Sequence, residues 1–238
     1  MKKLSLLVAL GALIPSGGLM AWISEPLFLY EADPYFSFSM STGAASPYKR
    51  ALNREITVGK HQGASLAVGY KYTSWRFELE AAFRTTEVRD YMRVEQIGGQ
   101  WAPPGGNFVP RTYEADGSIR DKSLMLNGYY DFRTGRIWRP YVGGGFGASY
   151  VALRDFELQD SIWPVRASDS DIVFAYQLMV GVLFELAPET DLTVGYRYFG
   201  AESVEWRIGD PQRPDRDETV KFTGSNLHLF EIGLHFNF

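Results

Sequence analysis

The sequence of 238 residues contains no cysteine and only three histidines. The absence of cysteine excludes disulfide-bonded scaffolds, cysteine nucleophiles and thiolate metal sites, and three histidines leave little room for a zinc site. Basic residues are not in excess either, because 24 Lys and Arg stand against 28 Asp and Glu, a formal net charge of −4. Nucleic-acid binding requires a basic face for phosphate contacts. We therefore expect no nucleic-acid partner, no bound metal and no cofactor.

The sequence also lacks an apolar run of the roughly 20 residues that a membrane-spanning helix needs. A shorter apolar run, residues 4–14, follows Lys2 and Lys3 and precedes a glycine-containing segment. This pattern predicts a secretory signal peptide over residues 1–21, cleaved after Gly18 or Ala21, followed by one mature domain over residues 22–238. Secretion without cysteine favours the bacterial envelope.

Aromatic residues and glycine are abundant, at 15% of the chain and 24 residues respectively. The segment 75–84 shows how apolar and polar residues are arranged. Its odd-numbered residues are all apolar, and four of its even-numbered residues are charged. Successive side chains of a strand point to opposite faces, so the segment predicts a β-strand with one apolar and one charged face.

The same alternation recurs in eight segments: 34–41, 65–72, 75–84, 123–132, 141–150, 174–185, 192–198 and 229–238. Three short connections separate them, at 73–74, 133–136 and 187–190, and these alternate with four long ones, at 42–63, 85–122, 152–171 and 200–226. Tight periplasmic turns and long extracellular loops produce this rhythm. The predicted fold is all-β: an eight-stranded antiparallel up-and-down transmembrane β-barrel.

The glycines indicate which face points outward. A soluble barrel would place its apolar residues inside. Here most strand glycines lie on the polar face, and a narrow interior needs small residues beside large ones: Gly69, Gly143, Gly145, Gly147, Gly181, Gly195 and Gly233. Aromatic residues gather near both ends of the apolar face, as in the two girdles of a bilayer-embedded barrel. We therefore expect the polar face to line the lumen and the apolar face to contact lipid.

Three segments carry a resemblance to known proteins: residues 140–147 (PYVGGGFG), 194–198 (VGYRY) and 231–238 (EIGLHFNF). With these segments in this order and a terminal phenylalanine, the sequence resembles the eight-stranded outer-membrane barrels of the outer-membrane-protein-A type, and more closely the opacity-like surface antigens of proteobacteria. The resemblance spans essentially all of the mature chain. It implies residence in the bacterial outer membrane and insertion by an assembly machinery that reads the C-terminal strand, with Phe236 and Phe238 as the signal.

The polar face predicts a network of lumen side chains, which comprises Lys71, Arg76, Glu78, Glu80, Arg84, Asp131, Gln177, Glu185, Arg197, Glu231 and His235. Charges inside a narrow barrel must pair, because isolated burial is costly. Two interpretations follow. The network is either a salt-bridged plug that makes the barrel rigid or the lining of a narrow, gated ion path. Eight strands enclose a space that side chains nearly fill, which argues against a pore for large solutes.

The sequence offers little support for catalysis. Ser225, His228, Glu231 and His235 lie close together in the chain, and some outer-membrane barrels modify lipid A with such residues. His228 and Glu231 differ in parity, so on a regular strand they project to opposite faces and lie beyond mutual hydrogen-bond reach. We therefore expect a non-enzyme, with lipid modification as the least favoured alternative.

The two longest connections contain the residue types that dominate binding surfaces. The second connection includes Arg89, Tyr91, Trp101 and Tyr113, and the fourth includes Trp206, Arg207 and several Asp and Arg residues. Such loops either only cover the barrel or bind a host or neighbouring surface. We expect a structural, surface-exposed membrane protein with antigen- or adhesin-like loops, surrounded by outer-membrane lipid and lipopolysaccharide. A small pore for ions or solutes is the alternative.

Overall fold

The computed structural model describes residues 32–50, 54–96, 108–134, 137–158, 166–210, 213–224 and 226–238. The expected signal peptide lies outside these residues. Within them the secondary structure is almost entirely β, and no helix is long and apolar enough to cross a membrane.

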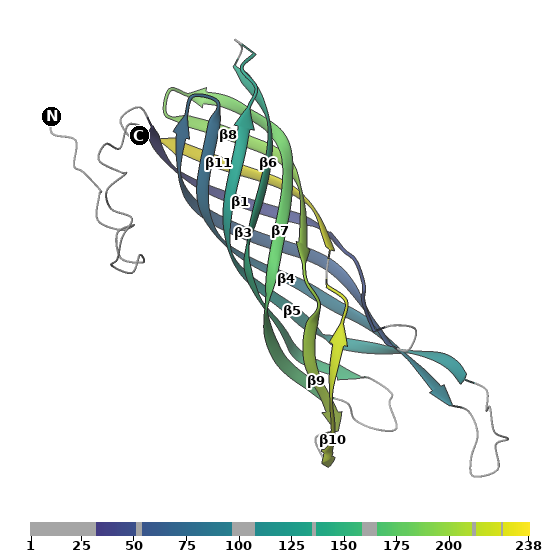
Figure 1. Ribbon diagram of the computed structural model, residues 1–238. Helices are drawn as coiled ribbons and strands as arrows, with labels where there is room; N and C mark the ends of the chain where they lie inside the picture. The colour runs from purple at the N-terminus through teal and green to yellow at the C-terminus, as the bar shows by residue number, and fades with distance from the viewer. Residues whose placement is uncertain are drawn as a thin grey trace, which may run out of the picture. The chain divides into compact units, whose positions relative to one another are not determined.

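Eight antiparallel strands close into a ring, which confirms the predicted barrel (Figure 1). They are β1 (Asp33–Ala45), β3 (Arg54–Tyr72), β4 (Trp75–Gln96), β5 (Phe108–Asp131), β6 (Trp138–Leu158), β7 (Arg166–Ala187), β8 (Thr190–Ala201) and β11 (Asn226–Asn237). Consecutive strands pair in this order, and β11 pairs with β1 over eleven residue pairs to close the ring. The short turns and the C-terminus share one end of the barrel (Figure 1).

The lipid-facing surface carries the apolar residues that the alternation assigned to it. Leu79, Leu126 and Val180 in the middle of the band are 43%, 54% and 50% exposed outside a closed ring. Aromatic side chains border the band at both ends, for example Trp75 at the turn end and Phe83 at the loop end. The expected inward glycines make room for large side chains. A Cβ on Gly143 would lie 2.4 Å from the Tyr129 ring, and one on Gly181 would lie 2.6 Å from the Tyr141 hydroxyl.

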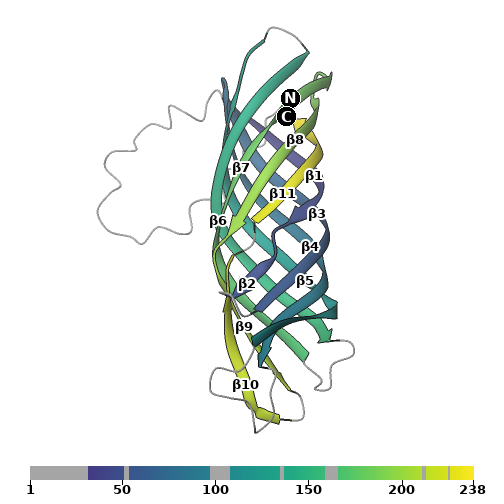
Figure 2. The ribbon, with the colours of Figure 1, turned by 90° about the vertical axis from the view of Figure 1, so that its right-hand side faces the viewer.

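The four long connections are much shorter than the sequence predicted. Strands β3 to β7 continue well past the apolar band, and three further strands lie in the remaining connections: β2 (Tyr48–Arg50), β9 (Val204–Asp210) and β10 (Arg213–Phe222). β2 pairs with β3, β9 with β10 and with β7, so each extends the wall. Figure 2 shows all three toward the end of the barrel opposite the C-terminus.

These extensions form a second ring above the first. It closes where the Thr223 N–H donates to the Lys49 carbonyl at 2.7 Å and the Lys49 N–H donates to Thr223 Oγ1 at 3.1 Å. We call this ring the outer barrel, made of β2, β9, β10 and the loop-side residues 54–62, 85–96, 108–122, 150–158 and 166–172. The remainder is the membrane barrel.

Strand β4 shows why the sequence concealed the outer barrel. Up to Phe83 its outward side chains are apolar and its inward ones mostly polar. From Thr85 onward the outward side chains are polar, whereas the inward Val88 and Tyr91 are buried and apolar. The chemical sense of the alternation therefore reverses at the membrane boundary.

Bulges in the outer barrel also interrupt the two-residue period. Pairing slips between Glu87 and Asp90, between Asp116 and Ser118, and between Leu153 and Phe156. At the β5–β6 bulge, Gly117 has a φ of 154° and Asp155 a φ of 53°. A one-residue slip moves every later side chain to the other face, so a search for one constant parity ends at each bulge.

Candidate functional site

The turn-end half of the lumen is organised around Arg76 on β4. Its Nε donates to both carboxylate oxygens of Asp131, at 2.9 and 3.0 Å. The guanidinium lies 4.5 Å from the centroid of the Tyr129 ring and 5.2 Å from that of Tyr141. The cation is thus held by one carboxylate and two aromatic faces, all of them buried.

Glu78 differs from the other lumen carboxylates because its hydrogen-bond donors are neutral. Tyr129 Oη donates to Glu78 Oε1 at 2.6 Å, Asn127 Nδ2 donates to the same oxygen at 2.9 Å, and Tyr35 Oη donates to Oε2 at 2.9 Å. Asn127 also donates to Glu80, 3.2 Å away, and so joins two parts of the network. These contacts bind β1, β4 and β5 together across the lumen.

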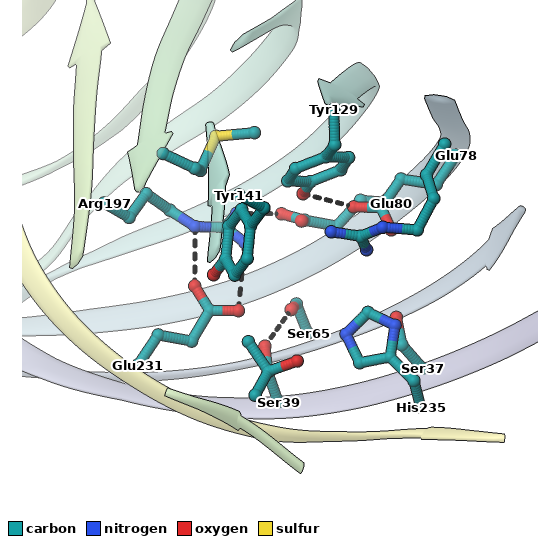
Figure 3. A pocket seen from close by; sticks show the side chains of 13 residues that line it. Ser37, Ser39, Ser65, Glu78, Glu80, Tyr129, Tyr141, Arg197, Glu231 and His235 are labelled. Carbon is teal, nitrogen blue, oxygen red and sulfur yellow. Dashed lines mark hydrogen bonds and ion pairs between the residues drawn. The ribbon is translucent and has the colours of Figure 1, made fainter. Parts of the chain in front are cut away.

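Arg197 on β8 occupies the centre of the network (Figure 3). Its Nη1 donates to Glu80 Oε1 at 2.5 Å and to Gln177 at 3.0 Å, and its Nε and Nη2 form a fork to Glu231 at 2.7 and 3.0 Å. Above it, Arg84 donates to Asp121 at 2.8 Å. Each of these arginines contacts at least one carboxylate, which offsets the cost of burying its charge.

Little free space is left among these side chains. The cavity shown in Figure 3 has a volume of about 20 Å³ and is lined by polar groups, among them Ser39, Ser65 and Glu231. That volume suits about one water molecule. The arrangement is chemically a cross-linked filling of the barrel rather than an open channel.

The structure brings nine of the eleven predicted lumen residues into this network or its walls: Arg76, Glu78, Glu80, Arg84, Asp131, Gln177, Arg197, Glu231 and His235. The other two lie elsewhere. Lys71 and Glu185 line a separate depression at the turn-end mouth, and Glu185 is exposed. Both stand near strand ends, where the lumen opens to solvent at the turn end.

The sequence analysis did not identify the uncharged members of the network, nor Asp121, the carboxylate that pairs with Arg84 near the loop end of the lumen. Tyr35, Tyr129 and Asn127 hold Glu78, and Asp121 accepts from Arg84 and from the Ser149 hydroxyl. The parity rule did place Asn127 and Tyr129 on the inner face. Their role depends on Glu78, which lies 49 and 51 residues away in the chain, and no local pattern reveals that contact.

An apolar core fills the outer barrel and the adjoining part of the membrane barrel. Trp206 and Phe222 are completely buried, and Tyr91 and Phe156 nearly so. The Trp206 ring lies 5.6 Å from Phe222, and Tyr91 lies 5.6 Å from Phe156 in an edge contact. The expectation that Tyr91 and Trp206 belong to recognition loops is therefore wrong: both side chains point into the core because their segments are strands.

His61 lies at the base of the outer barrel, where the polar network meets the apolar core. It is completely buried, its Nδ1 lies 2.7 Å from Thr86 Oγ1, and its Nε2 has no hydrogen-bond partner among the described residues. Burial and then the nearby Arg84 charge lower the pKa of His61 to about 4. The ring is therefore neutral at physiological pH.

The residues weighed for catalysis do not converge. His228 points outward, where its Nδ1 lies 2.5 Å from Tyr196 Oη, whereas Glu231 points inward to Arg197. His235 is on the inner face, 5.5 Å from the Tyr35 ring, and Ser225 lies outside the described residues. Across the described ranges, no group of three or more Asp, Glu and His residues is arranged to hold a metal ion.

The chain is similar to known proteins in sequence and in fold. A family described as surface antigen matches residues 38–238. An uncharacterised protein of Brucella suis is 30% identical over 203 residues, covering 74% of this chain and 69% of that protein. The outer membrane protein PagN of Salmonella typhimurium is 25% identical over 153 residues, covering 60% and 58%. The crystal structure of Neisserial surface protein A has a TM-score of 0.52 at 16% identity, covering 87% of this chain and 99% of that protein, a likeness of fold alone.

Proposed function

The chain belongs to the surface antigen family and is a bacterial outer-membrane β-barrel protein, and from this premise we propose that it presents its loop tips as a recognition surface on a rigid, closed support. The observation that carries the proposal is the outer barrel with its apolar core. A buried apolar core outside the membrane serves to fix the wall in one shape, as in any folded domain.

The filled interior argues against the alternative, a pore. Ions would have to pass the arginine–carboxylate network and then the apolar core that contains Trp206 and Phe222. Desolvating an ion in such a core is very costly. The polar network is better explained as the salt-bridged plug that keeps the membrane barrel rigid.

The outer barrel raises the loop tips clear of the membrane. On β4, residues 85–96 continue past the apolar band. At about 3.3 Å per residue and a tilt of about 40°, this length rises about 30 Å. In the sequence, the connection that follows β4 contains Trp101 and the one that follows β6 contains Trp163, residues of the type that anchors binding interfaces. The height lets these tips reach a host or neighbouring surface above the surrounding lipid.

Other partners follow from the location. Residues 1–21 would direct export, and the C-terminal strand with Phe236 and Phe238 would engage the assembly machinery. Phe238 is 79% exposed and Phe236 37% exposed on the lipid-facing side, so the folded barrel does not need either side chain for its interior packing. Lipopolysaccharide would surround the loop end. We assign no catalytic step, because His228 and Glu231 face opposite sides of the wall.

The test compares the full chain with a variant in which residues 97–107 and 159–165 are replaced by Gly–Ser linkers of equal length. Both are embedded in nanodiscs and applied to a glycan array and to immobilised extracellular-matrix proteins. We expect the full chain to bind and the variant to lose binding while keeping the heat-dependent gel mobility of a folded barrel.

Two results would refute the proposal. Binding no stronger than that of empty nanodiscs, or equal binding by both chains, would remove the recognition role from the tips. Reproducible step currents from the full chain in a planar bilayer would favour the pore.

A further inference from the structure

We propose that the β5–β6 wall, at the base of the outer barrel, binds the phosphorylated headgroup of an outer-leaflet glycolipid through Arg120, Lys122 and Arg154. The inference goes beyond the recognition role of the tips, because it concerns a different surface at a different height. It begins with three outward cations gathered on two adjacent strands.

The strand register places the three cations side by side. Lys122 pairs with Tyr150 across β5 and β6, Arg120 pairs with Ala152, and Ser118 pairs with Arg154. The residues therefore occupy successive outward positions within about two ladder steps of one another. The Arg154 guanidinium lies 3.5 Å from both the Tyr150 hydroxyl and the Ser168 hydroxyl, so neutral donors border the cations.

The depth of the cluster matches the headgroup level of a membrane. One outward position below Lys122 on β5 is Leu124, which is 55% exposed in the apolar band, and the β4 residue that pairs with Lys122 is Phe83, also 55% exposed. The next two outward residues above Lys122 on β5, Arg120 and Ser118, are polar. The ammonium and guanidinium groups thus stand where acyl chains end and charged headgroups begin.

Across the part of the chain that the structure describes, the three cations have no anionic partner. None of the ion pairs among the described residues includes Arg120, Lys122 or Arg154, although Glu87 and Asp155 lie on the same outer wall. The opposite wall differs. There Lys221 lies 3.5 Å from Glu205, and Lys49 lies 3.7 Å from Glu55. Of the three lysines on the opposite wall, Lys60 has no ion pair among the described residues, whereas on the β5–β6 wall all three cations have none.

A phosphate monoester on a sugar suits this arrangement. Arginine forms forked hydrogen bonds to phosphate oxygens, lysine adds a compact charge, and the Tyr150 and Ser168 hydroxyls suit sugar oxygens. Acyl chains of the same molecule would lie on Leu124 below Lys122 and on Phe83 beside it. Among outer-leaflet components, a phosphorylated glycolipid combines these features, whereas free inorganic phosphate lacks the chains.

The experiment uses the full chain in phosphatidylcholine nanodiscs, with bound lipid counted by native mass spectrometry. Bisphosphorylated lipid A and the same lipid A without phosphates are titrated separately. The test variant is Arg120→Gln/Lys122→Gln/Arg154→Gln. The matched control, Lys49→Gln/Lys60→Gln/Lys221→Gln, removes the same charge from the opposite wall.

We expect the unmodified chain to bind bisphosphorylated lipid A and the test variant to bind it at least tenfold more weakly, since each cation near a charged lipid surface contributes about fivefold. The control should stay within twofold. All substituted residues lie on the surface, and retained heat-dependent gel mobility shows that each variant is folded. The single variant Lys122→Gln gives a second reading, with an intermediate loss.

Four outcomes would overturn the site. Equal losses in both triple variants would mean general charge attraction, and equal binding of the dephosphorylated lipid would mean a contact of acyl chains alone. No binding above phosphatidylcholine would mean no site, and displacement by millimolar inorganic phosphate would mean a simple anion site. The loop-replacement chain keeps the β5–β6 wall, so it should bind lipid A normally. Failure of either proposal is thereby separable from failure of the other.

Discussion

A series of arginine substitutions along β4 tests whether the chemical sense of the wall reverses at the membrane boundary. Leu79 points outward in the apolar band and is 43% exposed to the lipid side. Thr85 points outward above the band, and Val88 points inward into the apolar core with 6% exposure. The same side chain is thereby placed in lipid, in water and in a protein core, all on one strand.

The three costs follow from these environments. A charge on the lipid face near mid-depth destabilises such barrels by about 2–4 kcal/mol, so Leu79→Arg should lose that much. Thr85→Arg should stay within about 0.5 kcal/mol, as exposed substitutions do. Val88→Arg places an unpaired charge in the core and should cost at least about 3 kcal/mol.

The assay is reversible urea unfolding of each variant, first in phospholipid vesicles and then in detergent micelles. A loose micelle hydrates an outward arginine more readily than a bilayer does, so the cost of Leu79→Arg should shrink in detergent. The cost of Val88→Arg should persist, because its environment is protein. If Thr85→Arg costs as much as Leu79→Arg, the membrane boundary is misplaced. If Val88→Arg is neutral, the outer barrel has no packed core.

Four further outcomes are expected. The pKa of His61 is about 4 in the folded protein and 6.5 in the unfolded chain, so between these pH values the folded protein binds fewer protons. The free energy of unfolding therefore falls as the pH drops from about 6.5 to 4. His61→Gln should remove up to about 3 kcal/mol of that loss, measured by urea titrations at pH 4.5 and 7.5. Trp206→Ala should cost about 3–5 kcal/mol and admit proteases to the outer barrel, and an unchanged digestion pattern would contradict its burial. Gly181→Leu should destabilise the barrel by about 1–3 kcal/mol or more through its clash with Tyr141, unlike the outward Gly144→Leu. Deleting Phe238 should lower outer-membrane yield in cells but leave detergent refolding intact, and a collapse of both would assign it to barrel closure instead.

Within the bilayer, local sequence was sufficient to predict the fold. Lipid on one side and a narrow lumen on the other impose one strict alternation, so segments such as 75–84 reveal their faces directly. The count of eight strands followed from the rhythm of short and long connections, and the inner face followed from glycines such as Gly143 and Gly181. The lumen residues Arg76, Glu80 and Arg197 could be named for the same reason, because a charged side chain of known parity has one face available to it.

The outer barrel was hidden from this reasoning. Its strands alternate in the opposite chemical sense, as in a soluble barrel, and bulges at Glu87–Asp90 and Leu153–Phe156 shift the parity. A search that assumes apolar residues always outward and one constant register therefore assigns these residues to loops. Trp206 is the clearest case. An isolated tryptophan among charged residues is typical of a binding loop, but the pairing of β9 with β10 directs this side chain into the apolar core.

The sequence by itself determined the membrane barrel, its strand number and the orientation of its faces, because each depends on the environment of single side chains and on two-residue periodicity. Only the tertiary structure decided which side chains form hydrogen bonds across the lumen, for example Glu78 with Tyr35 and Asn127. It also decided that the wall continues past the membrane as a packed outer barrel. Both depend on contacts between strands far apart in the chain, and their geometry exists only once the ring has closed.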